Sequence, residues 1–173
     1  MPQSGPARVT EERVLAHAIE TVGTGENVSI DKSGKWWKGN EPRDIREYLE
    51  AFGANEAYAV DASRSAVCSC GGEGFYLWAD DGEGVAKRIC PACEREHFVC
   101  DSEEYWSVAK PEQWRCVECA SMLANIGVGF SLYEDGEVRW LYVGERCSTC
   151  GVLGCMTQWK VAYAPSKQLL DQV

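Results

Sequence analysis

Hydrophobic residues follow two different periods along the chain, a helical one near the start and an alternating one farther on. Apolar residues recur at helical spacing at Val14, Leu15, Ala18, Ile19 and Val22. This spacing predicts an amphipathic helix over residues 10–22 that ends at Gly23. A second apolar stripe predicts a helix over residues 43–52 that ends at Gly53. We therefore interpret residues 1–64 as an α-rich cap that packs against the rest of the chain.

From residue 65 onward apolar and polar residues alternate, as is typical of half-buried β-strands. Two hairpins are predicted, strands 75–79 and 85–89 around Asp80-Asp-Gly-Glu-Gly84, and strands 127–133 and 138–143 around Glu134-Asp-Gly-Glu137. Shorter predicted elements are strands over 57–60, 97–100 and 157–163, a short helix from Ser102, and a last helix over 166–173. The predicted fold class is α+β, with the helical cap followed by two hairpin modules over residues 65–110 and 111–173.

Most of the ten cysteines fall in pairs that flank these hairpins. The first hairpin lies between Cys68-Ser-Cys70 and Cys90-Pro-Ala-Cys93, and the second between Cys116-Val-Glu-Cys119 and Cys147-Ser-Thr-Cys150. Because an antiparallel hairpin returns the chain to its starting point, each arrangement brings four thiols to one end of a ribbon. Four converging thiolates suit a tetrahedral Zn²⁺ ion. The sequence therefore predicts two structural zinc ions per chain, bound by these eight cysteines.

Cysteine pairs at the end of a hairpin resemble the zinc-ribbon fold group. The resemblance covers residues 68–93 and 116–150, and it is carried by pairs such as Cys90-Pro-Ala-Cys93 and Cys147-Ser-Thr-Cys150. It implies structural zinc and a three-stranded sheet in each of two tandem modules. Cys68-Ser-Cys70 departs from the ribbon pattern, which has two residues between the cysteines.

Two cysteines and one histidine lie outside this set of eight ligands. Cys100 follows an apolar pair and Cys155 precedes Met156, so both fit buried small hydrophobic residues. Either of them, or His97, could instead replace one ligand. The pairing also has two solutions, since neighbouring pairs can share a zinc or alternate pairs can interleave in a cross-brace. We expect neighbours to pair, because each hairpin then closes locally with less loss of loop entropy.

Charge bears on the kind of partner. The 173-residue chain has a formal net charge of −10, with −3 in residues 1–64, −5 in 65–110 and −2 in 111–173. Each zinc tetrathiolate adds a net −2, so two filled sites would bring the total from −10 to −14. Nucleic-acid affinity depends on cationic groups that meet phosphates. We therefore expect a protein partner with a basic surface, and no nucleic acid.

The location of the protein decides how its thiols are interpreted. The first residues show no cationic segment followed by an apolar run, so we expect no secretory signal and a cytoplasmic protein. No apolar stretch approaches the roughly 20 residues that span a bilayer. Paired thiols in the reducing cytoplasm indicate a metal site, whereas the same pairs in a secreted chain would indicate disulfides.

No catalytic constellation is evident in the sequence. The only histidines are His17 and His97, and a zinc hydrolase needs histidine or carboxylate ligands with one open coordination position. Cys147-Ser-Thr-Cys150 follows a strand as a redox dithiol would, but Gly151 to Gly154 is a poor helix start. The first hypothesis is therefore a non-catalytic zinc protein that binds another protein, as an adaptor or a neutralising partner. A nucleic-acid-binding ribbon is the second hypothesis and a thiol redox enzyme the third.

Trp36 and Trp37 form the one compact aromatic cluster in a polar stretch, with a lysine on each side. They are the candidate partner contact, because Trp is enriched at binding hot spots. Two alternatives stay open. One or both rings could pack onto the core, or they could stack on the bases of a single strand.

Overall fold

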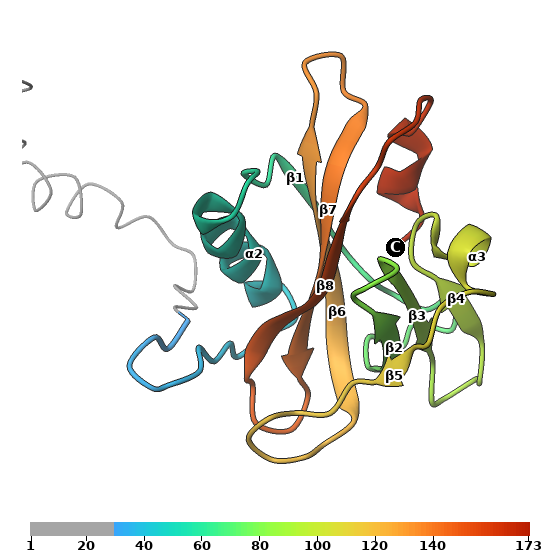
Figure 1. The fold of residues 1–173 in the computed structure, drawn as a ribbon. Coiled ribbons are helices and arrows are strands. Elements are labelled where there is room, and N and C mark those ends of the chain that lie inside the picture. Colours follow the sequence, from blue (N-terminus) through green and yellow to red (C-terminus); the bar gives the residue numbers. More distant parts are fainter. Residues whose placement is uncertain (1–29) are drawn as a thin grey trace, which may run out of the picture.

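The computed structural model describes residues 30–173, so the helix predicted over residues 10–22 lies outside the described part. The described chain is mostly antiparallel β-sheet with one longer helix, α2 (Asp44–Asn55), a single-turn helix, α3 (Ser102–Tyr105), and a 3₁₀ turn, η1 (Lys167–Asp171) (Figure 1). The strands are β1 (Ala62–Ser65), β2 (Phe75–Asp80), β3 (Val85–Ile89), β4 (Glu96–Phe98), β5 (Glu112–Gln113), β6 (Leu123–Leu132), β7 (Val138–Cys147) and β8 (Leu153–Lys160). Neither α2 nor α3 has the length and apolar character that a membrane-crossing helix needs.

All eight strands belong to one sheet. Its main path runs β4-β3-β2-β6-β7-β8, and β1 and β5 attach beside β6 and β2. Strands β1 and β2 share one edge of β6, because β1 pairs with Gly127 to Phe130 and β2 pairs with Leu123 and Ala124. The hairpins β2–β3 and β6–β7, which the cysteine pairs flank, are therefore joined by direct strand pairing.

The ribbon of β6, β7 and β8 has a hydrophobic core on each face. Helix α2 covers one face (Figure 1) and packs there through Ile45 and Leu49. The strands beneath it carry glycine at Gly127, Gly129 and Gly144, and a Cβ added at Gly144 would lie only 2.9 Å from Leu49 Cδ1. The larger core on the other face includes Phe75, Leu77, Val99, Ile126, Val128, Phe130, Leu141, Val143 and Leu169. The helix thus packs where the strands of the ribbon carry glycine and leave room for Ile45 and Leu49.

Both predicted hairpins are present, but several element boundaries were wrong. Gly53 does not end α2, which continues to Asn55. The strand predicted over 57–60 is absent, and the first strand begins at Ala62. The Tyr58 carbonyl accepts a hydrogen bond from the Tyr142 hydroxyl (2.6 Å). The predicted last helix is the 3₁₀ turn η1. The predicted closing strand is displaced toward the N-terminus, as β8.

Candidate metal centres

Eight cysteines form two groups of four. The first centre is Cys68, Cys70, Cys90 and Cys93, and the second centre is Cys116, Cys119, Cys147 and Cys150. In each group the four Sγ atoms all lie within 4.8 Å of one another, so each group could hold a metal ion. The structure thus brings neighbouring pairs together, with no interleaving between the two groups.

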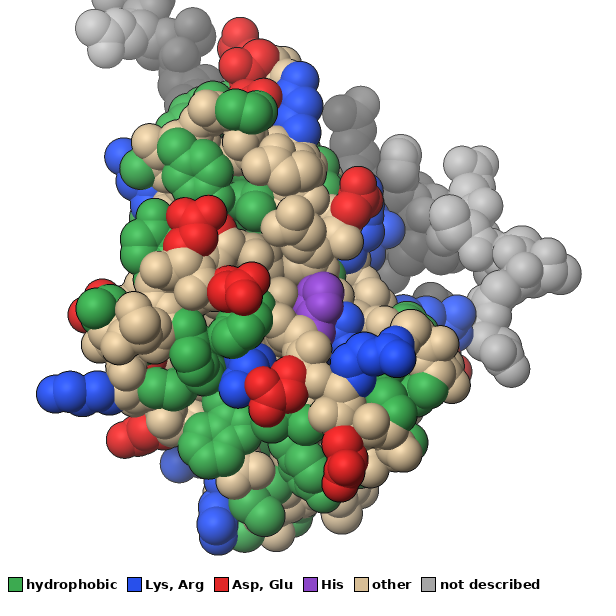
Figure 2. All heavy atoms as spheres, turned by 90° about the vertical axis from the view of Figure 1, so that its right-hand side faces the viewer, with side chains coloured by type: hydrophobic (Ala, Val, Ile, Leu, Met, Phe, Trp, Pro, Cys, Tyr) green, Lys and Arg blue, Asp and Glu red, His purple; other side chains and the backbone are tan. Residues whose placement is uncertain are grey.

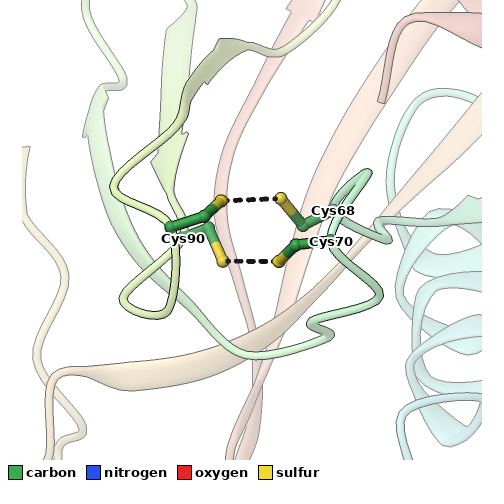
Figure 3. A group of neighbouring side chains, drawn as sticks. Cys68, Cys70 and Cys90 are labelled. Atoms are coloured by element: carbon green, nitrogen blue, oxygen red, sulfur yellow. Dashed lines mark hydrogen bonds between the residues drawn. The ribbon is translucent and has the colours of Figure 1, made fainter.

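The sulfur positions fit a tetrahedral ion better than a disulfide. In the first centre Cys68 Sγ lies 3.5 Å from Cys93 Sγ and Cys70 Sγ lies 3.6 Å from Cys90 Sγ, with the two pairs reaching toward each other from opposite loops (Figure 3). The corresponding Sγ–Sγ distances in the second centre are 3.4 and 3.5 Å. A tetrahedron with Zn–S bonds of about 2.3 Å has edges of about 3.8 Å, whereas a disulfide bond is about 2.04 Å long. All the cysteines are free thiols.

The same backbone turn closes all four cysteine pairs. The residue after the second cysteine donates its N–H to the carbonyl of the first, at 2.7 Å for Gly71 to Cys68, 2.8 Å for Glu94 to Cys90, 3.0 Å for Ala120 to Cys116 and 2.9 Å for Gly151 to Cys147. The first cysteine donates its own N–H to the carbonyl one residue farther on, at Gly72, Arg95, Ser121 and Val152. The residue after the second cysteine has a φ of 89° at Gly71, 59° at Glu94, 60° at Ala120 and 80° at Gly151. The shorter pair Cys68-Ser-Cys70 therefore forms an equivalent turn with one residue fewer.

These turns aim backbone N–H groups at the sulfur atoms. The N–H of Cys70 donates to the Cys68 sulfur and, with the neighbouring thiols, lowers the pKa of Cys68 to about 6. Burial raises the pKa of Cys147, but the N–H groups of Cys150 and Thr149 outweigh it and bring that pKa to about 7. Metals bind the thiolate, not the thiol. Each centre thus contains a cysteine that ionises near neutral pH.

Each centre has a buried side and a more exposed side. The first cysteine of every pair is buried, at Cys68, Cys90, Cys116 and Cys147. The second cysteines are exposed, apart from the half-buried Cys150. Four thiolates complete the tetrahedral shell of a bound ion, and such closed shells are typical of structural sites and not of catalytic ones.

The three alternative ligands lie in neither group. Cys100 is buried with its Sγ 3.5 Å from the Leu169 carbonyl oxygen, and Cys155 Sγ lies 3.5 Å from the Thr157 carbonyl oxygen. Burial raises the pKa of both thiols. His97 pairs across strands with Arg88, and burial lowers the pKa of its imidazole.

Charged side chains lie beside both centres. At the second centre Lys38 Nζ lies 2.8 Å from Glu118 Oε2, and both the Glu118 carboxylate and the Cys150 thiol raise the pKa of Lys38. At the first centre Arg88 is buried on β3, and its burial lowers the pKa of the guanidinium while the nearby Cys68 and Cys90 thiols act to raise it. Lys38 and Glu118 are 80 residues apart, so no local pattern could have linked them.

The candidate partner contacts Trp36 and Trp37 border a groove beside α2. Trp36 is 40% exposed, and Trp37 makes an edge-on contact with Tyr48 at 5.9 Å between ring centres. Tyr48 in turn stacks on Phe52 at 6.1 Å. The groove has a volume of about 390 Å³ and is lined by all four rings. From the sequence, Tyr48 and Phe52 could be assigned only to the apolar side of a helix.

Comparison with known proteins adds no family assignment, because the chain matches no protein-family model, no curated protein and no solved structure. The class therefore follows from the geometry alone. The chain is a mostly antiparallel β-protein with two tetracysteine groups, each of which could bind a metal ion.

Proposed function

We propose that this is a non-catalytic cytoplasmic protein in which two structural Zn²⁺ ions stabilise two tandem zinc-ribbon-like modules, and that it acts by binding another protein. The observation that carries the proposal is the pair of closed tetracysteine groups, each built from two equivalent turns. Zinc is favoured because tetrahedral all-sulfur sites suit Zn²⁺ or iron–sulfur centres, and a single ion fits the observed sulfur separations.

The position of each centre explains why zinc would be structural. The first centre joins the loop before β2 to the loop after β3, and the second joins the loop before β6 to the end of β7. Each ion would therefore connect the two strands of a hairpin at its open end. Because such sites form only in the folded chain, metal-binding energy contributes directly to folding energy.

Charge supports a protein partner with a basic surface. The chain has a net charge of −10, and two zinc tetrathiolates would make it more negative. On the face shown in Figure 2, acidic and basic side chains are interspersed with hydrophobic ones. A nucleic-acid-binding surface would instead gather Lys and Arg on one face or along one stripe. The net negative charge fits an adaptor, or a protein that neutralises a basic partner.

Two measurements test the proposal. Zinc-free protein, prepared with a strong chelator under reducing conditions, should lose its cooperative unfolding transition and regain it when Zn²⁺ is added. Captured partner proteins should be rich in Lys and Arg, and their association should slow as salt screens the attraction. Cooperative unfolding that persists without metal would contradict structural zinc. Tight binding to single-stranded RNA at physiological salt would contradict the protein-partner function.

A further inference from the structure

The tryptophan-bearing turn is attached to the second metal centre. Residues 31–39 form a small loop in which Asp31 and Lys38 exchange backbone hydrogen bonds of 2.8 and 2.9 Å. From this loop the Gly39 N–H donates to the Gly151 carbonyl at 2.9 Å, and the Trp37 carbonyl accepts the Leu153 N–H at 2.8 Å. Gly151 is the left-handed residue that completes the last cysteine turn. The backbone around Trp37 is therefore hydrogen-bonded to the chain that leaves Cys150.

A side-chain contact repeats this attachment on the other turn of the same centre. Lys38 pairs with Glu118, which lies between Cys116 and Cys119. The loop is thus joined to both turns that supply the second centre, through Lys38 to one and through Trp37 and Gly39 to the chain that follows the other. Within residues 30–173 the loop also contacts α2, through the Lys32–Glu47 ion pair, and β7, through Arg146 and the Gly39 carbonyl, but none of its hydrogen bonds or ion pairs reaches the turns of the first centre. Order in the loop should follow occupancy of the second centre.

The groove that this loop borders has features of a recognition site. One wall is the loop itself, with Lys35, Trp36 and Trp37, and the other is α2, with Tyr48 and Phe52. Its volume of about 390 Å³ falls in the range of about 300–1,000 Å³ that is common for ligand pockets. Exposed Trp beside apolar rings is the composition of a binding hot spot. The groove can therefore take an anchoring apolar side chain.

The charges around the groove favour a partner that carries a Lys or Arg next to this anchoring apolar side chain. The chain's own cations already occupy a face of two of the rings, since Lys32 Nζ lies 4.5 Å from the Trp37 ring centre and Lys35 Nζ lies 4.9 Å from that of Trp36. A partner cation therefore needs a carboxylate at the groove. Glu56 lines the groove, and no ion pair of residues 30–173 includes it. A Lys or Arg of a partner could pair with this carboxylate.

We propose that this groove is the docking site for the protein partner, that it takes a segment with an apolar side chain next to a Lys or Arg, and that metal in the second centre holds its tryptophan wall in place. This inference rests on the proposed function, since it assigns that function to a surface. It also means that partner binding depends on metal in the second centre and not on metal in the first. Release of zinc from the second centre would open the wall and release the partner, whereas the first centre would support only the fold.

Two matched glycine variants distinguish the effect of the second centre on the tryptophan loop from that of the first. Gly151→Ala and Gly71→Ala place the same methyl group at equivalent positions of two cysteine turns, both with positive φ. The added Cβ at Gly151 would lie 2.5 Å from the Gly39 carbonyl oxygen, whereas the one at Gly71 would meet no atom within 4 Å. Only Gly151→Ala should therefore displace the tryptophan loop. We expect faster amide hydrogen exchange at Gly39 and Leu153, and stronger acrylamide quenching of Trp fluorescence, in that variant alone.

The wild-type protein provides the same test without any substitution. As a chelator withdraws zinc stepwise, amide exchange at Gly39 and Leu153 should accelerate together with metal loss from the second centre. Loop amides that stay protected while that centre is empty would overturn the coupling. Absence of bound zinc from the purified protein would instead contradict the proposed function, so the two failures are distinguishable.

A random peptide library displayed on phage supplies the probe for the groove. Selection on the zinc-loaded protein should enrich peptides with an aromatic or aliphatic residue next to Lys or Arg. Trp36→Ala should weaken these peptides at least about thirtyfold, as expected for a hot-spot residue. The matched control is Tyr105→Ala, because Tyr105 is 43% exposed and lies outside the groove. Enrichment of acidic peptides, or equal binding by the two variants, would overturn the docking site.

Discussion

The left-handed backbone conformation of the residue after each cysteine pair leads to a quantitative prediction about stability. Gly71→Ala should destabilise the zinc-loaded protein by about 1 kcal/mol. The φ of Gly71 is 89°, and a Cβ there would have no atom within 4 Å, so the change acts through backbone conformation and not through a clash. A non-glycine residue in the left-handed region costs about 1–2 kcal/mol, and the smaller conformational entropy of the unfolded alanine chain offsets about 0.5–1 kcal/mol of that.

The reverse substitution provides the control. Ala120 occupies the equivalent position of another turn with a φ of 60°, so Ala120→Gly should stabilise the protein by up to about 1 kcal/mol. Urea denaturation with excess zinc measures both effects as shifts in midpoint at constant slope. Destabilisation by Gly71→Ala together with stabilisation by Ala120→Gly would exclude a general preference for alanine over glycine. A Gly71→Ala protein more stable than the wild type would refute the cost assigned to the left-handed backbone at this turn.

Three other predictions concern the centres, the core and the charge. Cys90→Ser should lose one of two metal ions and much of the fold, whereas Cys100→Ser should keep both, as measured by elemental analysis; equal metal loss would contradict the ligand set. Gly144→Ala should destabilise by about 1–3 kcal/mol in thermal or chemical denaturation, because its Cβ would lie 2.9 Å from Leu49 Cδ1; a neutral effect would mean that α2 docks elsewhere. The protein should show no mobility shift of DNA or RNA at physiological salt, because it is acidic; a sequence-selective shift would revive the nucleic-acid hypothesis.

Local patterns were sufficient to predict the hairpins and the grouping of the cysteines. Alternation around Asp-Gly turns predicts β2–β3 and β6–β7, and the cysteine pairs lie at the open ends of these hairpins because strand pairing is local there. The turn around Cys68-Ser-Cys70 looked irregular in the sequence. In the structure Gly71 takes the left-handed conformation, so the shorter pair forms the same kind of turn.

Long-range features could not be predicted in the same way. The glycines beneath α2 looked like ordinary strand glycines, and only the docked helix shows that Gly144 makes room for Leu49. The attachment of Trp37 to Leu153 joins residues that are distant in sequence. A single sequence indicates exposure and periodicity but not which distant segments meet. From the sequence, the two exposed-looking tryptophans were therefore the one part of the groove beside α2 that could be recognised.

The central claim is tested most directly by the metal content and ligand set of the protein purified under reducing conditions without added metal. Elemental analysis should give two zinc atoms per chain, and X-ray absorption at the zinc edge should show four sulfur neighbours at about 2.3 Å. One zinc atom per chain, nitrogen or oxygen in the first shell, or metal-free protein with oxidised cysteine pairs would contradict the account.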